Sequence, residues 1–272
     1  MLRREQKRHK QEAIILEMVR QIRRRHPRMG TRKLLVKLGP MLAAEGLKMG
    51  RDRLFSLLKQ VDLLVKRRKR RHRTTISGWW RTANLLPGLT ISQPNQVWVS
   101  DITYLQTEVQ PFVYLFMIMD LFSRYIVGWQ VADTLAASGA LVALEQAIQQ
   151  AQLPILGTIH HSDHGVQYTC HNYLNALQLY NIQPSMGEVG NCYENAFAER
   201  VIGTLKHEYF LDARLANHSH AYDMSSQSVD LYNLDRPHLS LNYATPASVY
   251  FKESFVAPVV IIPAVDEAVV CA

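Results

Sequence analysis

The order of strand-like and helix-like segments after residue 95 restricts the fold of this chain more than any other feature. The stretch QVWVSDITYL from Gln96 alternates and is rich in β-formers, so it predicts a strand, and PFVYLFMIMD and RYIVGWQVA predict two more. Good helix formers and short buried runs then alternate. The elements expected after these three strands are a helix, strand, helix, strand and helix at residues 135–151, 155–160, 171–180, 182–186 and 192–211.

This order predicts an α/β domain of the ribonuclease-H-like class, a mixed sheet flanked by helices, over residues 96–252. The fold alone does not decide the function. With 272 residues the chain exceeds the usual size of one domain, so a second, smaller unit is expected. Residues 253–272 are expected to be a C-terminal tail.

The second unit is a small all-α domain expected over residues 1–65. A basic helix over about residues 10–25 ends at His26-Pro27, because a residue before proline avoids the helical region. A second helix begins with Thr31 as N-cap and is interrupted or kinked at Gly39-Pro40. A third helix, about 51–60, buries its leucines. Short helices with Gly-containing turns indicate a helix-turn-helix module, although any small three-helix bundle has a similar pattern.

The charge of the chain is divided between these two parts. Residues 1–80 carry 24 Lys and Arg against 6 Asp and Glu, whereas the rest of the chain is acidic, and the whole chain has a net charge of +8. Residues 66–73, KRRKRRHR, begin a basic linker expected over 66–95. Such a division indicates nucleic acid as partner; the alternative is a solvated basic tail without a specific partner. The DNA contacts predicted from this pattern are Arg51, Arg53, Arg67, Arg68, Lys69 and Arg70.

Other features exclude membrane and secreted proteins as classes. No apolar run approaches the ~20 residues of a membrane span, and the N-terminus lacks a secretory signal. The 3 cysteines show neither disulfide nor metal-ligand spacing. We therefore expect a cytoplasmic protein, associated with the nucleoid when it is bound to DNA.

Three carboxylates stand where this fold would bring them together. Asp101 lies within the first strand, Asp163 ends the fourth, and Glu199 lies on the last helix, with 35 residues between Asp163 and Glu199. Clustered carboxylates repel one another, and divalent ions such as Mg²⁺ or Mn²⁺ resolve that conflict. Two such ions can activate a nucleophile and stabilise a leaving oxygen in phosphodiester chemistry.

Five ordered motifs make this chain resemble the DDE transposases and retroviral integrases, in particular the second-frame protein (OrfB) of bacterial insertion sequences. The motifs are PNQVWVSDITY (94–104), MDLFSRYIVGW (119–129), HSDHGVQY (161–168), GNCYENAFAERVIGTLKHEY (190–209) and YNLDRPHLSLNYATP (232–246). The 35-residue gap is also typical of this family. The stretch MGTRKLLVKL…GRDRLFSLLKQ is similar to the helix-turn-helix segment that precedes the core in the family.

The resemblance implies that Asp101, Asp163 and Glu199 form the catalytic, metal-binding triad of an Mg²⁺-dependent polynucleotidyl transferase, with two ions. It implies DNA cleavage and strand transfer in transposition, with a circular intermediate before insertion. It further implies the first-frame protein (OrfA) as partner or fusion, and a homo-oligomer on DNA. Lys206 shares a helical face with Glu199 and could hold a DNA phosphate; a solvated lysine is the alternative.

Several neighbouring residues have competing interpretations. Glu194 competes with Glu199 as ligand, although the family usually carries Asp at that position. Asp120 is expected to cap a turn. We expect His160, His161 and His164 to hydrogen-bond to a loop or to DNA rather than to bind zinc. Asn191 and Asn195 are candidates for substrate contact or helix capping, and Tyr104 and Tyr168 are expected in the core or as positioning residues. The sequence assigns no chemical role to Arg236-Pro237-His238.

Two further functions compete with the transposase prediction. One is a catalytically silent DNA-binding regulator derived from a transposase, which the intact triad disfavours. The other is a metal-dependent nuclease on RNA–DNA hybrids, which the helix-turn-helix pattern and the Asp–Glu spacing disfavour. Joined DNA product distinguishes the three.

Overall fold

The structure is a computed structural model, and it describes residues 2–65, 82–151, 154–187, 196–251 and 259–262. Several predicted residues lie outside this part of the chain. They are Arg67, Arg68, Lys69 and Arg70 of the basic run, and Asn191, Glu194 and Asn195 before the last helix.

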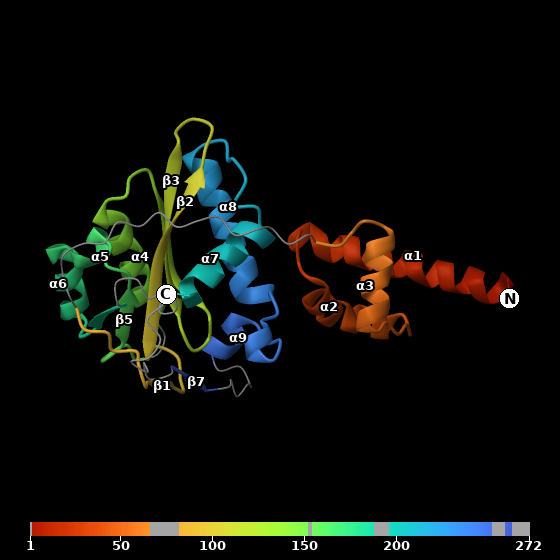
Figure 1. The fold of residues 1–272 in the computed structure, drawn as a ribbon, viewed down its shortest axis with the longest axis horizontal. Coiled ribbons are helices and arrows are strands. Elements are labelled where there is room, and N and C mark those ends of the chain that lie inside the picture. The colour runs from red at the N-terminus through yellow and green to blue at the C-terminus, as the bar shows by residue number, and fades with distance from the viewer. Residues whose placement is uncertain (1, 66–81, 152–153, 188–195, 252–258, 263–272) are drawn as a thin grey trace, which may run out of the picture.

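A five-stranded mixed sheet forms the centre of the larger domain, in the order β4-β3-β2-β5-β6 (Figure 1). The first three strands in sequence form an antiparallel meander, and β5 and β6 continue the sheet parallel to β2. The strands are β2 (Val97–Gln106), β3 (Phe112–Asp120), β4 (Ile126–Ala132), β5 (Ile159–Ser162) and β6 (Gln183–Met186). This is the predicted ribonuclease-H-like arrangement.

Helices cover both faces of this sheet, and the alternation of side chains along β2 shows why. Val97, Val99 and Leu105 belong to a core cluster shared with α7 (Ala196–Glu208) and α8 (His218–Asp230). Trp98 points the other way, into a cluster shared with α4 (Ala137–Gln150), α5 (Val166–Thr169) and α6 (His171–Leu179). Because side chains on a strand alternate with period two, one apolar strand supplies both cores.

The fourth strand begins later than predicted. Residues 155–158 form a turn instead, in which the Thr158 amide donates to the Ile155 carbonyl at 3.0 Å and Gly157 has a φ of 81°. A left-handed glycine suits a turn and is incompatible with a continuing strand. The strand therefore runs through Ser162, directly up to Asp163.

The N-terminal residues form three helices with an apolar core of their own: α1 (Leu2–Arg25), α2 (Thr31–Ala44) and α3 (Arg51–Gln60). Two predicted details are wrong. Gly30, not Thr31, is the N-cap of α2, and it has no side-chain cap. Pro40 does not interrupt α2, because Leu38 and Leu42 on either side of it pack into the same cluster and hold the helix together.

The chain after α7 contains elements that the sequence analysis did not assign. After α8 come a π-helical turn η1 (Leu231–Asp235), a short 3₁₀ helix η2 (Leu239–Leu241) and α9 (Pro246–Tyr250). A small antiparallel pair joins β1 (Thr90–Ile91), in the expected linker, to β7 (Val260–Ile261), in the expected tail. None of the helices in the described residues combines the length and apolarity that a membrane crossing requires.

Candidate active site

Asp101 lies on β2, and Asp163 directly follows β5, the neighbouring parallel strand. β2 and β5 pair in register, with Val99 opposite His161, so Asp101 and Asp163 each follow by two residues. Adjacent strands are about 4.8 Å apart, which brings the two carboxylates onto the same edge of the sheet. Asp163 begins the loop after β5, and its Oδ1 accepts the Gly165 amide at 3.0 Å.

The Asp101 carboxylate is in an environment that disfavours its charge. Burial and the negative charges of Asp163 and Glu199 raise its pKa to about 7, against the weaker opposing effects of the Ile102 amide and Lys206. The Ile102 amide donates to Asp101 Oδ1 at 2.8 Å. Burial is the largest cause of the raised pKa, and the charge of Asp163 is the next.

Glu199 reaches the site from α7, which packs on the face of β2 that carries Val97, Val99 and Leu105. Ala198, Val201, Ile202 and Leu205 form the buried face of α7. Glu199 is exposed in the first turn of the helix. The sequence-predicted triad is thus brought to one region of the fold, with Asp101 and Asp163 on the sheet and Glu199 on the covering helix.

Lys206 lies on the same helix, two turns after Glu199. Its Nζ donates to the Tyr104 carbonyl at 2.9 Å. Burial lowers the pKa of Lys206, whereas the charges of Asp101 and Asp212 oppose that shift. The ammonium group is therefore directed toward β2, within the field of Asp101.

The donors of this site fit a hard divalent cation. Three carboxylates supply only oxygen ligands, which Mg²⁺ and Mn²⁺ prefer, and a bound cation would remove the repulsion that raises the Asp101 pKa. In the described residues, no three His, Cys, Asp or Glu side chains are already close enough together to hold an ion.

The histidines around Asp163 are engaged in hydrogen bonds within the protein. His160 Nε2 pairs with the Tyr173 hydroxyl at 2.9 Å, and His161 Nδ1 pairs with Ser185 Oγ at 3.0 Å. Burial lowers the pKa of His160 to about 3 and that of His161 to about 4, so both are neutral. His164 Nε2 donates to the Gly187 carbonyl at 2.6 Å.

Asp120 has a structural environment. It is fully buried and accepts the Asn95 amide at 2.7 Å and the Ser123 amide at 2.8 Å, as a turn-capping residue does. Of the two tyrosines, Tyr168 is buried, but Tyr104 is 40% exposed and therefore not a core residue. Tyr104 lies at an exposed position of β2, where its ring packs edge-on against Phe112 and Tyr114.

The motif Arg236-Pro237-His238 acquires a contact that the sequence did not predict. The Arg236 guanidinium donates through Nε and Nη2 to both oxygens of Glu208, at 2.8 and 2.9 Å. Glu208 is the last residue of α7. The only sequence signal was that both residues lie in family motifs; their 28-residue separation concealed the pairing.

The predicted DNA contacts on α3 are accessible. The side chains of Arg51 and Arg53 are 58% and 46% exposed, and each has an acidic neighbour, Asp52 at 2.8 Å and Glu12 at 3.4 Å.

Comparison with known proteins supports the class of protein that the fold and the three carboxylates indicate. Two family models, both described as integrase core domain, match residues 91–192 and 180–246. The "uncharacterized 31 kDa protein" of insertion element IS600 from Shigella sonnei is 34% identical, over 83% of this chain and 82% of its own length. The transposase of insertion sequence element IS904 from Lactococcus lactis is 30% identical, over 90% and 97%.

Among solved structures, the HTLV-2 integrase catalytic core domain in complex with magnesium aligns with a TM-score of 0.45 and 18% identity, over 61% of this chain and 99% of that one. The mixed sheet flanked by helices, with Asp101 and Asp163 at the same edge of the sheet, defines the integrase core class. The family model matches and the two relatives assign the chain further: it belongs to the bacterial insertion-sequence transposases with an integrase core domain. The predicted function, DNA transposition by a DDE-type transposase, is confirmed, and no finding favours a silent regulator.

Proposed function

We propose that Asp101, Asp163 and Glu199 hold two Mg²⁺ or Mn²⁺ ions and that this chain cleaves element ends and joins them to target DNA at that site. The observation that carries the proposal is the register of β2 and β5, which sets Asp101 beside Asp163 under the helix that carries Glu199. The raised pKa of Asp101 supports it, since burial and two neighbouring carboxylates disfavour its charge without a cation.

Bound divalent ions would supply Lewis-acid activation of a water or a 3′-hydroxyl and stabilisation of the leaving oxygen. The residues of the chain divide the remaining work. Asp101 and Asp163 form the fixed part of the site, because both are anchored on or next to central strands. Glu199 completes it from α7. Lys206, which now donates to a backbone carbonyl, would hold the phosphate beside the ions.

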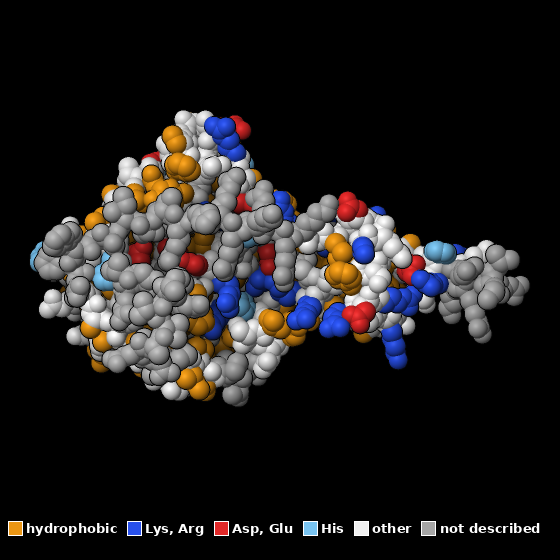
Figure 2. All heavy atoms as spheres, viewed as in Figure 1, with side chains coloured by type: hydrophobic (Ala, Val, Ile, Leu, Met, Phe, Trp, Pro, Cys, Tyr) orange, Lys and Arg blue, Asp and Glu red, His pale blue; other side chains and the backbone are white. Residues whose placement is uncertain are grey.

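The bundle formed by residues 2–65 is the proposed DNA-recognition domain. Its separate apolar core supports a division near residue 65. The expected start of the catalytic core at residue 96 is too late, because Leu86 and Ile91 of the expected linker are buried in the core cluster of that domain. Figure 2 shows Lys and Arg side chains gathered on the bundle and at its junction with the core. Arg51 and Arg53 on α3, together with the basic run that includes Arg67, Arg68, Lys69 and Arg70, are the proposed phosphate contacts. We further propose the cytoplasm as its location, and OrfA and further copies of the chain as partners on DNA.

A strand-joining assay with Mg²⁺ tests the proposal. It uses DNA with the ends of the element that encodes this chain and compares the two-frame fusion with the same fusion carrying Glu199→Gln. Loss of joined product with retained DNA binding is the expected result. Equal activity would contradict the assignment and direct attention to Glu194. No product from either protein, with DNA binding retained, would contradict catalysis by this chain.

A further inference from the structure

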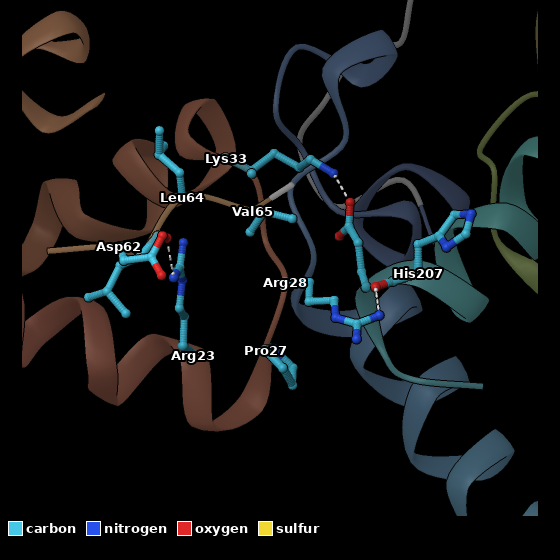
Figure 3. Close-up of a pocket in the computed structure, with 11 residues that line it drawn as sticks. Arg23, Pro27, Arg28, Lys33, Asp62, Leu64, Val65 and His207 are labelled. Carbon is cyan, nitrogen blue, oxygen red and sulfur yellow. Dashed lines mark hydrogen bonds and ion pairs between the residues drawn. The ribbon is translucent and has the colours of Figure 1, made fainter. Parts of the chain in front are cut away.

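A network of ion pairs joins the N-terminal bundle to the end of the helix that carries Glu199. Lys33 of α2 donates through Nζ to Glu208 Oε1 at 2.6 Å. The same carboxylate accepts the two bonds from Arg236. Lys33 and Glu208 line a cleft of about 830 Å³ between the bundle and the core, where Figure 3 shows Lys33 reaching across from the bundle.

A second group of contacts lies around Asp235, at the end of η1. Its carboxylate pairs with Lys37 of α2, with Arg25 at 3.3 Å and with His26 Nε2 at 2.9 Å. The other ring nitrogen of His26, Nδ1, pairs with the Tyr209 hydroxyl at 3.1 Å. Glu208 and Asp235 are therefore the core carboxylates that contact the lysines of α2.

Arg28, in the turn between α1 and α2, adds a third contact. Its guanidinium carbon lies 4.0 Å from the centre of the Phe210 ring, and Nη1 donates to the His207 carbonyl at 3.4 Å (Figure 3). It also lies 3.5 Å from Asp212. All three contacts fall on the last turn of α7 or on segments packed beside it.

The core holds its side of this interface in place without the bundle. The two parallel bonds from Arg236 orient the Glu208 carboxylate, and Arg236 is only 5% exposed. Lys33 then meets an acceptor whose orientation is already set. Removing Lys33 and Lys37 should therefore loosen the docking and leave the fold of the core intact.

The geometry points to Glu208 and Asp235 as positioning residues that fix the distance between the DNA-recognition bundle and the carboxylates, and so determine where a bound DNA strand is cleaved. The inference rests on the proposed function. Glu208 lies nine residues after Glu199 on the same helix, about 13.5 Å along its axis at 1.5 Å per residue. Docking commits Lys33 and Lys37 of α2 to the core and leaves the exposed arginines of α3 for DNA.

Mapping cleavage positions tests this inference. The full chain fused to its upstream frame is incubated with end-labelled element DNA and Mg²⁺, and cleavage is mapped at nucleotide resolution. We expect one dominant position for the wild type. For Lys33→Met/Lys37→Met we expect cleavage spread over several nucleotides, with an affinity for DNA within about threefold of the wild type. Lys33→Arg/Lys37→Arg, which keeps the charges, should restore the single position.

The matched control replaces Lys10 and Lys48, two exposed lysines of the bundle, by Met. Hydrogen exchange of the same proteins without DNA reports the docking itself. Amides of residues 205–212 should exchange faster in the Lys33→Met/Lys37→Met variant and not in the control. Unchanged exchange would overturn the docking role. Faster exchange with an unchanged cleavage position would overturn the positional role.

These outcomes are distinct from failure of the proposed function. If Glu199→Gln cleaves like the wild type, the triad assignment is wrong, and the cleavage map still decides whether the bundle sets the position. If the wild type does not cleave at all, both the proposed function and the positional role are overturned, whatever the exchange result.

Discussion

The two ends of α7 carry carboxylates in opposite electrostatic surroundings. Near its start, Glu199 faces Asp101 and Asp163, and burial and like charges raise the Asp101 pKa to about 7. At its end, burial alone would raise the pKa of Glu208, but Arg236 and Lys33 outweigh that effect and hold the pKa below its ordinary value. One end is the proposed cation site, and the other already has its cations within the protein.

This difference separates two uses of a buried carboxylate. A structural carboxylate is neutralised by its own chain, so its charge stabilises the fold. A metal-binding carboxylate is left with like charges, so its stabilisation has to come from outside the chain. The direction of the pKa shift distinguishes the two cases: the pKa is raised for Asp101, beside the start of α7, and lowered for Glu208, at its end.

The largest expected effect concerns Asp101, on β2 beside the start of α7. Asp101→Asn should reduce joined product by at least ~100-fold, because loss of a direct ligand should exceed the 10–100-fold typical of indirect ones. Without metal, the same variant should be more stable than the wild type in thermal unfolding, since a repelled, buried carboxyl is removed. A variant that is less stable and fully active would show that Asp101 is not at the metal site.

The opposite stability change is expected at the end of α7. Glu208→Gln leaves the Arg236 guanidinium buried without its carboxylate and should lower the free energy of unfolding by ~3–5 kcal/mol, measured by urea denaturation. Glu145→Gln, at an exposed position on α4, is the control and should change it by less than ~0.5 kcal/mol. Equal effects of the two substitutions would remove the contrast between the two ends.

The affinity for metal should depend on pH through Asp101. A carboxyl with a pKa of about 7 must release its proton to bind a cation, so affinity for Mn²⁺ should fall about tenfold from pH 8 to pH 6. Calorimetric titration in buffers of different ionisation enthalpy would detect the released proton. The stability of the metal-free protein should change with pH in the opposite direction. Because the pKa of Asp101 is higher in the folded than in the unfolded state, the free energy of unfolding should decrease as pH rises from about 4 to 7. Affinity that does not change with pH would contradict a protonated Asp101 in the metal-free site.

The smallest effect is expected at the interface between bundle and core. Burial lowers the pKa of His26, and the hydrogen bond and charge of Asp235 oppose that shift only in part. The unfolded chain therefore takes up the proton first, and stability should fall as pH drops below about 6.5, by no more than ~1.4 kcal/mol at pH 5.5. His26→Gln should lose this dependence in urea denaturation at the two pH values, whereas His9→Gln, at an exposed position of α1, should keep it.

Much of the fold followed from local patterns. Strand order, helix order and the separate N-terminal bundle were predicted because apolar periodicity and turn residues act over a few positions. The errors have two different causes. The left-handed conformation of Gly157 delays the start of β5, and the packing of Leu38 and Leu42 overrides the tendency of Pro40 to break α2. Of the elements after residue 212, η1, η2 and α9 are only three to five residues long, too short for a periodic pattern, and the longer helix α8 was also not assigned.

The sequence by itself determined the class of this protein and named the three carboxylates, since motif order and the spacing of Asp163 and Glu199 are properties of the chain alone. Only the tertiary structure decided that Asp101 lies in register with Asp163, and that Arg236 and Lys33 share Glu208. Those relations join residues 28 to 175 positions apart. Strand register and side-chain pairing over such separations depend on how whole elements pack, and no local pattern encodes them.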